Sequence, residues 1–126
     1  LAVGAGGFLG AVARHLLVSR IGQVLGPNGV AGLPVGILAV NILGSLLMGM
    51  LVSVLALAWS PPAALRALLS VGVLGAFTTF STFSLEAVTL IERGAWSQAA
   101  VYVLGSVLLS VLGLLAGLWG MRWLLS

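Results

Sequence analysis

The chain of 126 residues is strongly apolar, because 61% of its residues are hydrophobic and only 6% are charged. A soluble domain typically carries about 25% charged residues, so this composition excludes a soluble protein and predicts an integral membrane protein. The net charge of +3 comes from Arg residues spread along the chain, without the basic patch that nucleic-acid binding needs, and the absence of Cys excludes disulfides and thiolate metal sites.

The first apolar segment runs from about residue 2 to residue 19, close to the roughly 20 residues that span a membrane. Gly6 and Gly10 are four positions apart and predict a small-residue face for helix packing. The segment lacks a basic start, so we interpret it as a membrane helix and not as a cleaved signal, and we expect an initiator Met to precede Leu1. A linker rich in Gly, Pro and Asn follows over residues 20–34 and predicts a short interfacial turn.

Three further segments follow, at about residues 35–59, 63–93 and 98–121. The second ends at the interfacial Trp59 and the helix stop Ser60-Pro61-Pro62, and the third is too long for one straight span. We therefore predict a single all-α membrane domain over residues 1–126 with four transmembrane helices.

The third segment contains a polar interruption that reads GAFTTFSTFSLE over residues 75–86. Its hydroxyl side chains offer the backbone competing hydrogen bonds, so we predict a break near the middle of this helix. Unpaired backbone groups inside a bilayer are tolerated where they line a cavity, bind an ion or meet protein, which makes the break a candidate binding site. The alternative is that the hydroxyls simply bond to carbonyls one turn earlier.

Arg residues near the helix ends show no bias between the two sides of the membrane. Arg66 and Arg122 fall on the side of the termini, and Arg20 and Arg93 fall on the other side. Since an excess of Lys and Arg normally sets the orientation, this balance favours insertion in both orientations. A homodimer of opposed orientations, surrounded by lipid, is the assembly that we expect.

Several polar side chains lie within the predicted helices. Asn41 is interpreted either as a helix-to-helix hydrogen bond or as a ligand contact. A stripe along the fourth helix is interpreted either as a packing seam or as one wall of a polar track; its members are Tyr102, Ser106, Ser110, Gly113 and Gly117.

Charged groups within the helices are few. Arg14 is costly to bury and could extend to the interface, while His15 lacks the neighbours of a metal ligand. Glu86 is expected to pair with Arg14, to accept hydroxyl hydrogen bonds, or to sit in a wet vestibule. No arrangement of nucleophile, base or metal ligands survives, so an enzyme is excluded and ion permeation remains, with either a small anion or a cation as the ion.

The residues quoted above also match a known family. GAFTTFSTFSLE, VNILGS around Asn41 and GGFLGAVAR leading to Arg14 resemble the Fluc (CrcB) family of bacterial fluoride channels over essentially the whole chain. The resemblance implies a passive fluoride channel of the bacterial cytoplasmic (inner) membrane, formed by an antiparallel dual-topology homodimer. It also implies a sodium ion held at the dimer centre by backbone carbonyls at the helix break.

Carried onto this chain, the resemblance implies that the sodium-binding carbonyls belong to Gly75 and Thr78. The implied pore residues are Asn41, Phe80, Phe83, Ser106 and Ser110, with Tyr102, Glu86, Ser81 and Thr82 as further pore-lining positions. The chain departs from the family pattern at Ile37, where the family usually has Thr.

Two other functions are compatible with a short four-helix membrane protein. A small dual-topology multidrug exporter shares the length and helix count, but such exporters need a Glu in the first helix, where this chain has Arg14. A structural membrane subunit without transport activity would leave the polar stripe unexplained.

Overall fold

The computed structural model describes residues 1–26 and 29–126, and this part of the chain is helical apart from its connections and one isolated bridge between Val30 and Leu33. Four helical spans in it are long and apolar enough to cross a membrane. They are α1 (Ala2–Leu25), α2 (Val35–Leu57), a composite third span (Ala63–Glu92) and α6 (Trp96–Leu125). The predicted four-helix membrane class is therefore confirmed.

The third span is interrupted where the sequence predicts a break. Its pieces are α3 (Ala63–Ala67), the π-helix η1 (Leu68–Leu74), α4 (Gly75–Phe77) and α5 (Phe80–Glu92). Thr78 and Thr79 lie between α4 and α5 in extended conformation. The π-helical turns before the break have no counterpart in the sequence-based prediction.

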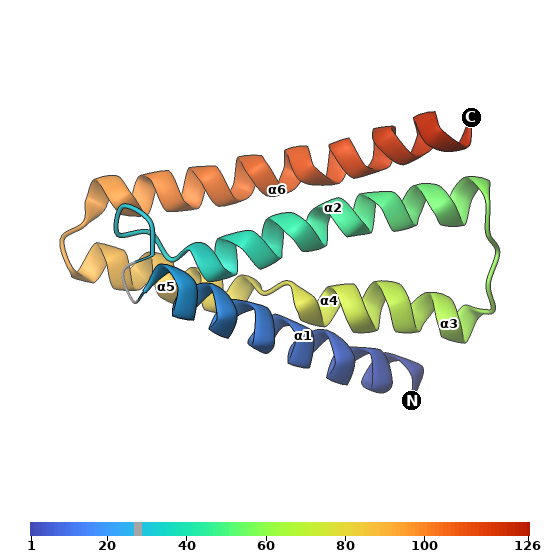
Figure 1. The fold of residues 1–126 in the computed structure, drawn as a ribbon, viewed down its shortest axis with the longest axis horizontal. Coiled ribbons are helices and arrows are strands. Elements are labelled where there is room, and N and C mark those ends of the chain that lie inside the picture. The colour runs from blue at the N-terminus through green and yellow to red at the C-terminus, as the bar shows by residue number, and fades with distance from the viewer. Residues whose placement is uncertain (27–28) are drawn as a thin grey trace.

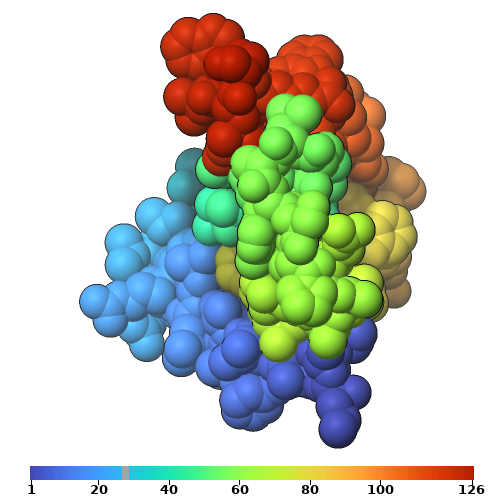
Figure 2. Space-filling view, turned by 90° about the vertical axis from the view of Figure 1, so that its right-hand side faces the viewer, coloured from blue at the N-terminus to red at the C-terminus, as the bar shows by residue number. Residues whose placement is uncertain are grey.

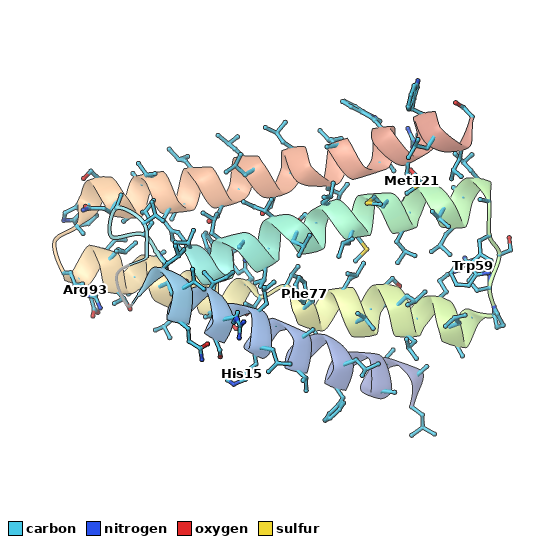
Figure 3. All side chains as sticks on the ribbon, in the orientation of Figure 1. His15, Trp59, Phe77, Arg93 and Met121 are labelled. Atoms are coloured by element: carbon cyan, nitrogen blue, oxygen red, sulfur yellow. The ribbon has the colours of Figure 1, made fainter. Side chains whose placement is uncertain are left out.

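The spans are arranged as two neighbouring pairs (Figure 1): α2 packs mainly against α6, and α1 packs mainly against η1 and α4. Both termini and the loop from α2 to α3 lie at the same end of the molecule. Figure 2 shows this end, with the α2–α3 loop between the C-terminal end of α6 and the start of α1. The opposite end carries the connection around Arg93 (Figure 3).

Glycines bring α1 against the third span, as the spacing of Gly6 and Gly10 predicts. A Cβ added to Gly72 would lie 2.8 Å from the Cα of Gly6, and a Cβ added to Gly10 would collide with the carbonyl of Val73. The two backbones are thus in direct contact, which is the usual way in which helices approach closely in lipid.

The α2–α6 contact has the same chemistry. A Cβ on Gly49 would collide with the carbonyl of Leu114, and a Cβ on Gly117 with the carbonyl of Leu46. The fully buried Ser53 also donates a hydrogen bond to the carbonyl of Leu118 at 2.6 Å. This end of the α6 stripe is therefore a packing seam.

Several helix ends differ from the prediction. α1 continues to Leu25 and not to Ser19, because nothing after Arg20 stops a helix until Gly26, which has a φ of 82°. α2 ends at Leu57 instead of residue 59, while α6 extends the predicted 98–121 segment at both ends. The predicted turn within 20–34 includes residues 27–28, which lie outside the described residues.

Candidate functional site

The break in the third span is stabilised locally by its own hydroxyl residues. Thr79 is the N-cap of α5, and its Oγ1 accepts a hydrogen bond from the backbone N–H of Thr82 at 3.3 Å. Thr78 and Ser84 instead donate to carbonyls one turn earlier, at 3.2 and 2.9 Å. Different members of the hydroxyl cluster thus cap the new helix after the break and bond to carbonyls one turn earlier, and a capping hydroxyl is what starts a new helix.

Asn41 of α2 pairs with the backbone of the break. Its Nδ2 donates to the Thr79 carbonyl at 3.0 Å, and its Oδ1 accepts from the Thr79 N–H at 2.8 Å. An amide has two donors, so one N–H is left over after these bonds. The prediction of a hydrogen bond between helical spans is confirmed, since Asn41 of α2 bonds to the break in the third span; Asn41 also lines the neighbouring cavity.

Gly44, one turn further along α2, makes this pairing sterically feasible. A Cβ at Gly44 would collide with the side chain of Thr78 and lie 3.2 Å from the ring of Phe77. Phe77 itself is buried in the interior, next to α2 (Figure 3).

Arg14 bonds to the other side of the break. Its guanidinium donates to the carbonyl of Ala76 at 2.9 Å. This carbonyl would normally accept from the amide of Phe80, which the extended residues carry out of reach. The neighbouring His15 is exposed and points away from the bundle (Figure 3). Arg14 therefore bonds a backbone carbonyl and not Glu86.

A cavity of about 230 Å³ lies against the break, between α2, α5 and α6. It collects most of the predicted pore residues. Its lining is Asn41, Ser45, Thr78, Thr79, Phe80, Phe83, Ser106, Val107 and Ser110. We call it the inner cavity. Sequence reasoning had not assigned Ser45, Thr79 or Val107 to it. Ser45 lies four positions after Asn41 and Val107 lies three positions before Ser110, and this helical spacing is the signal that relates both to the cavity wall.

Ser106 has an unusual environment within the inner cavity. The residue is 5% exposed, and its Oγ is buried without a hydrogen-bond partner among the described residues. A buried hydroxyl without a partner is costly, so a polar occupant of the cavity is expected to bond to it. Ser106 and Ser110 line the cavity while Gly113 and Gly117 pack on α2, so the α6 stripe is a cavity wall at one end and a seam at the other.

The two cavity phenylalanines differ in burial. Phe83 is 7% exposed, whereas Phe80 is 76% exposed in the single chain. Their ring centroids are 5.4 Å apart at an interplanar angle of 50°, and the Phe83 ring lies 5.3 Å from that of Tyr102. Tilted rings of this kind present positively polarised edges to their surroundings.

Tyr102 and Glu86 do not line the inner cavity. Tyr102 is 1% exposed and donates its hydroxyl to Glu86 Oε2 at 2.6 Å, which confirms the expectation that Glu86 accepts a hydroxyl hydrogen bond. Glu86 also lines an outer cavity of about 270 Å³ near the end of the molecule that carries Arg93. We call this outer cavity the vestibule; its lining is Gly32, Leu33, Pro34, Leu85, Glu86, Thr89, Leu90 and Arg93.

The remaining predicted positions lie close to the break or in the core. Ser81 and Thr82 form a hydroxyl cluster with Thr79 Oγ1, each at 3.3 Å, and line neither the inner cavity nor the vestibule. Ile37 is 5% exposed and packs in the apolar core with Val40, Phe83 and Tyr102. The Ile37 side chain fills part of that core and offers no hydroxyl of its own.

The carbonyls of Gly75 and Thr78 have both lost their helical partners. The amide four residues after Gly75 belongs to Thr79 and bonds to Asn41, and the amide four residues after Thr78 belongs to Thr82 and bonds to Thr79 Oγ1. Such carbonyls have the chemistry of a hard-cation ligand. Clusters of three or more His, Cys, Asp or Glu side chains that could hold a metal ion are absent from residues 1–26 and 29–126.

The chain is similar to known proteins over most of its length. Residues 1–118 match the family described as "CrcB-like protein, Camphor Resistance (CrcB)". The chain belongs to the CrcB family.

CrcB relatives are similar over nearly their whole length. The protein from Nitrobacter winogradskyi is 51% identical over 94% of this chain and 90% of its own length. The protein from Rhodospirillum centenum is 53% identical over the same shares of the two chains. The protein from Ruegeria sp. is 50% identical over 100% of this chain and 96% of its own. Each is named "Fluoride-specific ion channel FluC", which agrees with the exclusion of an enzyme.

Proposed function

We propose that this CrcB-family protein is a passive fluoride-selective channel of the bacterial cytoplasmic membrane. The names of its relatives support the ion and the class of activity. The observation that carries the proposal in this chain is the unpartnered, buried hydroxyl of Ser106 on a cavity that also has phenylalanine rings and an amide on its wall.

The cavity chemistry suits a small anion. Ser106 and Ser110 contribute hydroxyls that can donate, Asn41 retains one N–H, and the ring edges of Phe80 and Phe83 carry partial positive charge. A strongly hydrated ion must exchange its water for several donors without being bound so tightly that it cannot leave. A set of modest donors, without a Lys or Arg among the lining residues, meets both conditions.

We further propose that the conducting form is a homodimer of opposed orientations. Phe80 lies on the inner cavity yet is 76% exposed, so the cavity needs another wall on that side. A second copy would supply it, and the balanced Arg count permits a copy inserted the other way round.

A sodium ion at the dimer centre completes the proposal. The carbonyls of Gly75 and Thr78 fit this role, because side-chain acceptors have taken the amides that would otherwise pair with them. The ion would supply positive charge at a place where the unwound backbone presents carbonyl oxygens. Asn41 and Arg14 hold the break open for it by bonding Thr79 and Ala76.

The deciding experiment is ion efflux from liposomes that contain the purified protein. Separate preparations are loaded with fluoride, with chloride, or with a cationic dye under a proton gradient, and loss is followed with ion-selective electrodes or dye fluorescence. We expect rapid loss of fluoride alone. Proton-driven movement of the dye would instead establish an exporter, and retention of all solutes would contradict a transport function.

A further inference from the structure

Glu86 lies on the wall of the vestibule and bonds to Tyr102, a residue next to the inner cavity. It lines the vestibule and also a crevice of about 180 Å³ between the end of α1 and the start of α2. Its hydrogen-bond donor Tyr102 packs against Phe83, which lines the inner cavity, and precedes Ser106 by one helical turn on α6. The Tyr102–Glu86 hydrogen bond therefore links the wall of the vestibule to a residue that packs against the wall of the inner cavity.

This bond uses the only donor that Tyr102 has. A phenolic side chain carries a single O–H, and here that O–H points to a carboxylate oxygen at 2.6 Å. Hydrogen bonds to ionised acceptors are short and roughly twice as strong as bonds between neutral groups. An anion that passes between the cavities meets this donor already engaged.

We propose that Glu86 is a tethered competitor for the permeating anion. It holds the Tyr102 hydroxyl while no ion is present, yields it as an anion arrives, and takes it back as the anion leaves. The competition limits how long an anion stays at Tyr102, so Glu86 sets the balance between binding and release. This inference rests on the proposed fluoride path and adds to it a role for the one carboxylate on that path.

The role differs from simple charge repulsion. A carboxylate beside an anion path repels every anion, whether or not Tyr102 has its hydroxyl. Competition for a donor requires the hydroxyl. The two effects are separated by a double-mutant cycle, since repulsion occurs in both backgrounds and cancels in the comparison.

The test combines Glu86→Gln with Tyr102→Phe. Gln keeps the size and an acceptor oxygen but loses the charge, and Phe keeps the ring that packs on Phe83. The fluoride concentration that gives half-maximal flux is measured in liposomes for the four combinations. We expect Glu86→Gln to lower this concentration about five- to tenfold and to lower the maximal flux when Tyr102 is present. In the Tyr102→Phe background the change should be at least about threefold smaller.

Glu92→Gln is the matched control, because Glu92 is the exposed last residue of the same helix and lines neither cavity. It should leave the half-maximal concentration unchanged. Equal effects of Glu86→Gln in both backgrounds would overturn the proposal in favour of charge alone, and no effect in either would remove Glu86 from the ion path. Size-exclusion profiles check folding of every variant. Absence of fluoride flux in the unmodified protein would reject the proposed function itself, which is a distinguishable result.

Discussion

At the scale of single residues, Phe80 and Phe83 lie on one cavity but have different packing. Phe83 belongs to the buried core, whereas Phe80 is mostly exposed in the single chain. Phe83→Ile is therefore expected to lower stability as well as transport, and Phe80→Ile to affect transport with little cost within the chain. We expect fluoride flux per folded protein to fall at least about tenfold in both, because Ile has no polarised ring edge.

Flux and folding must be measured separately for these two variants. Size-exclusion chromatography gives the folded fraction, and fluoride efflux is then normalised to it. Flux near that of the unmodified protein in both variants would assign the rings to packing, and the ion path would then be sought along Tyr102, Ser106 and Ser110.

Asn41 allows a second test at this scale, since its amide bonds both the N–H and the carbonyl of Thr79. Asn41→Asp keeps the acceptor, removes the donor and introduces a negative charge beside the cavity. Asn41→Leu removes both bonds without adding charge. Loss of one bond in the Asp variant and of both in the Leu variant should destabilise each by about 1–3 kcal/mol, visible as a lower thermal midpoint in detergent.

Comparison of the two Asn41 variants separates the effect of an added negative charge on transport from the effect of losing the amide. We expect both to reduce fluoride efflux, with Asp the stronger because the ion meets a like charge. If Leu conducts normally, the amide is not needed either to hold the break or to contact the ion.

At the scale of the helices, the glycine seam between α2 and α6 predicts a position-specific response to one methyl group. A Cβ at Gly117 would collide with the backbone of α2, whereas a Cβ at Gly105 of the same helix has nothing within 4 Å. Gly117→Ala should separate the helices and cost about 1–3 kcal/mol. Gly105→Ala should be neutral or stabilising by up to about 1 kcal/mol, because Ala is the better helix former. Thermal unfolding in detergent compares the two, and equal midpoints would contradict the packing described here.

Much of the helical framework could be predicted from the sequence, because lipid imposes long apolar spans and small contact residues. The four spans, the break within residues 75–86 and the contact of Gly6 and Gly10 with the third span all follow from such local patterns. The π-helix at Leu68–Leu74 could not be predicted, since nothing in its composition differs from an ordinary apolar helix. The bond from Arg14 to Ala76 joins residues 62 positions apart and depends on how α1 packs, which no pattern in one segment contains.

At the scale of the whole molecule, Gly75 tests the proposed dimer. It is exposed, and a Cβ there would approach only the carbonyl of Ser70, at an ordinary contact distance of 3.6 Å. A single chain should therefore tolerate Gly75→Val. We expect the variant to fold but to lose dimerisation and flux, because the added side chain would occupy the contact between the copies. Cross-linking in membranes measures dimer formation, and an intact, active dimer would place the partner elsewhere.

Orientation provides a second test at this scale. A C-terminal tag should be reachable from both sides of the membrane, since Arg residues do not favour one side. Adding two or three Lys to one terminus should fix the orientation and abolish flux, and co-expression of an oppositely biased copy should restore it. Full activity of a chain fixed in one orientation would contradict the opposed dimer.

α6 carries two kinds of contact along one face. Ser106 and Ser110 lie beside the inner cavity, and Gly113 and Gly117, three and seven positions after Ser110, pack against α2. The α-helical repeat keeps both sets of residues on the same face of α6. One residue inserted between Ser110 and Gly113 would rotate the glycines by about 100° relative to the hydroxyls, so that only one of the two sets could face its partner. Length changes in this chain are therefore expected to be tolerated at the ends of α6 and excluded from its middle.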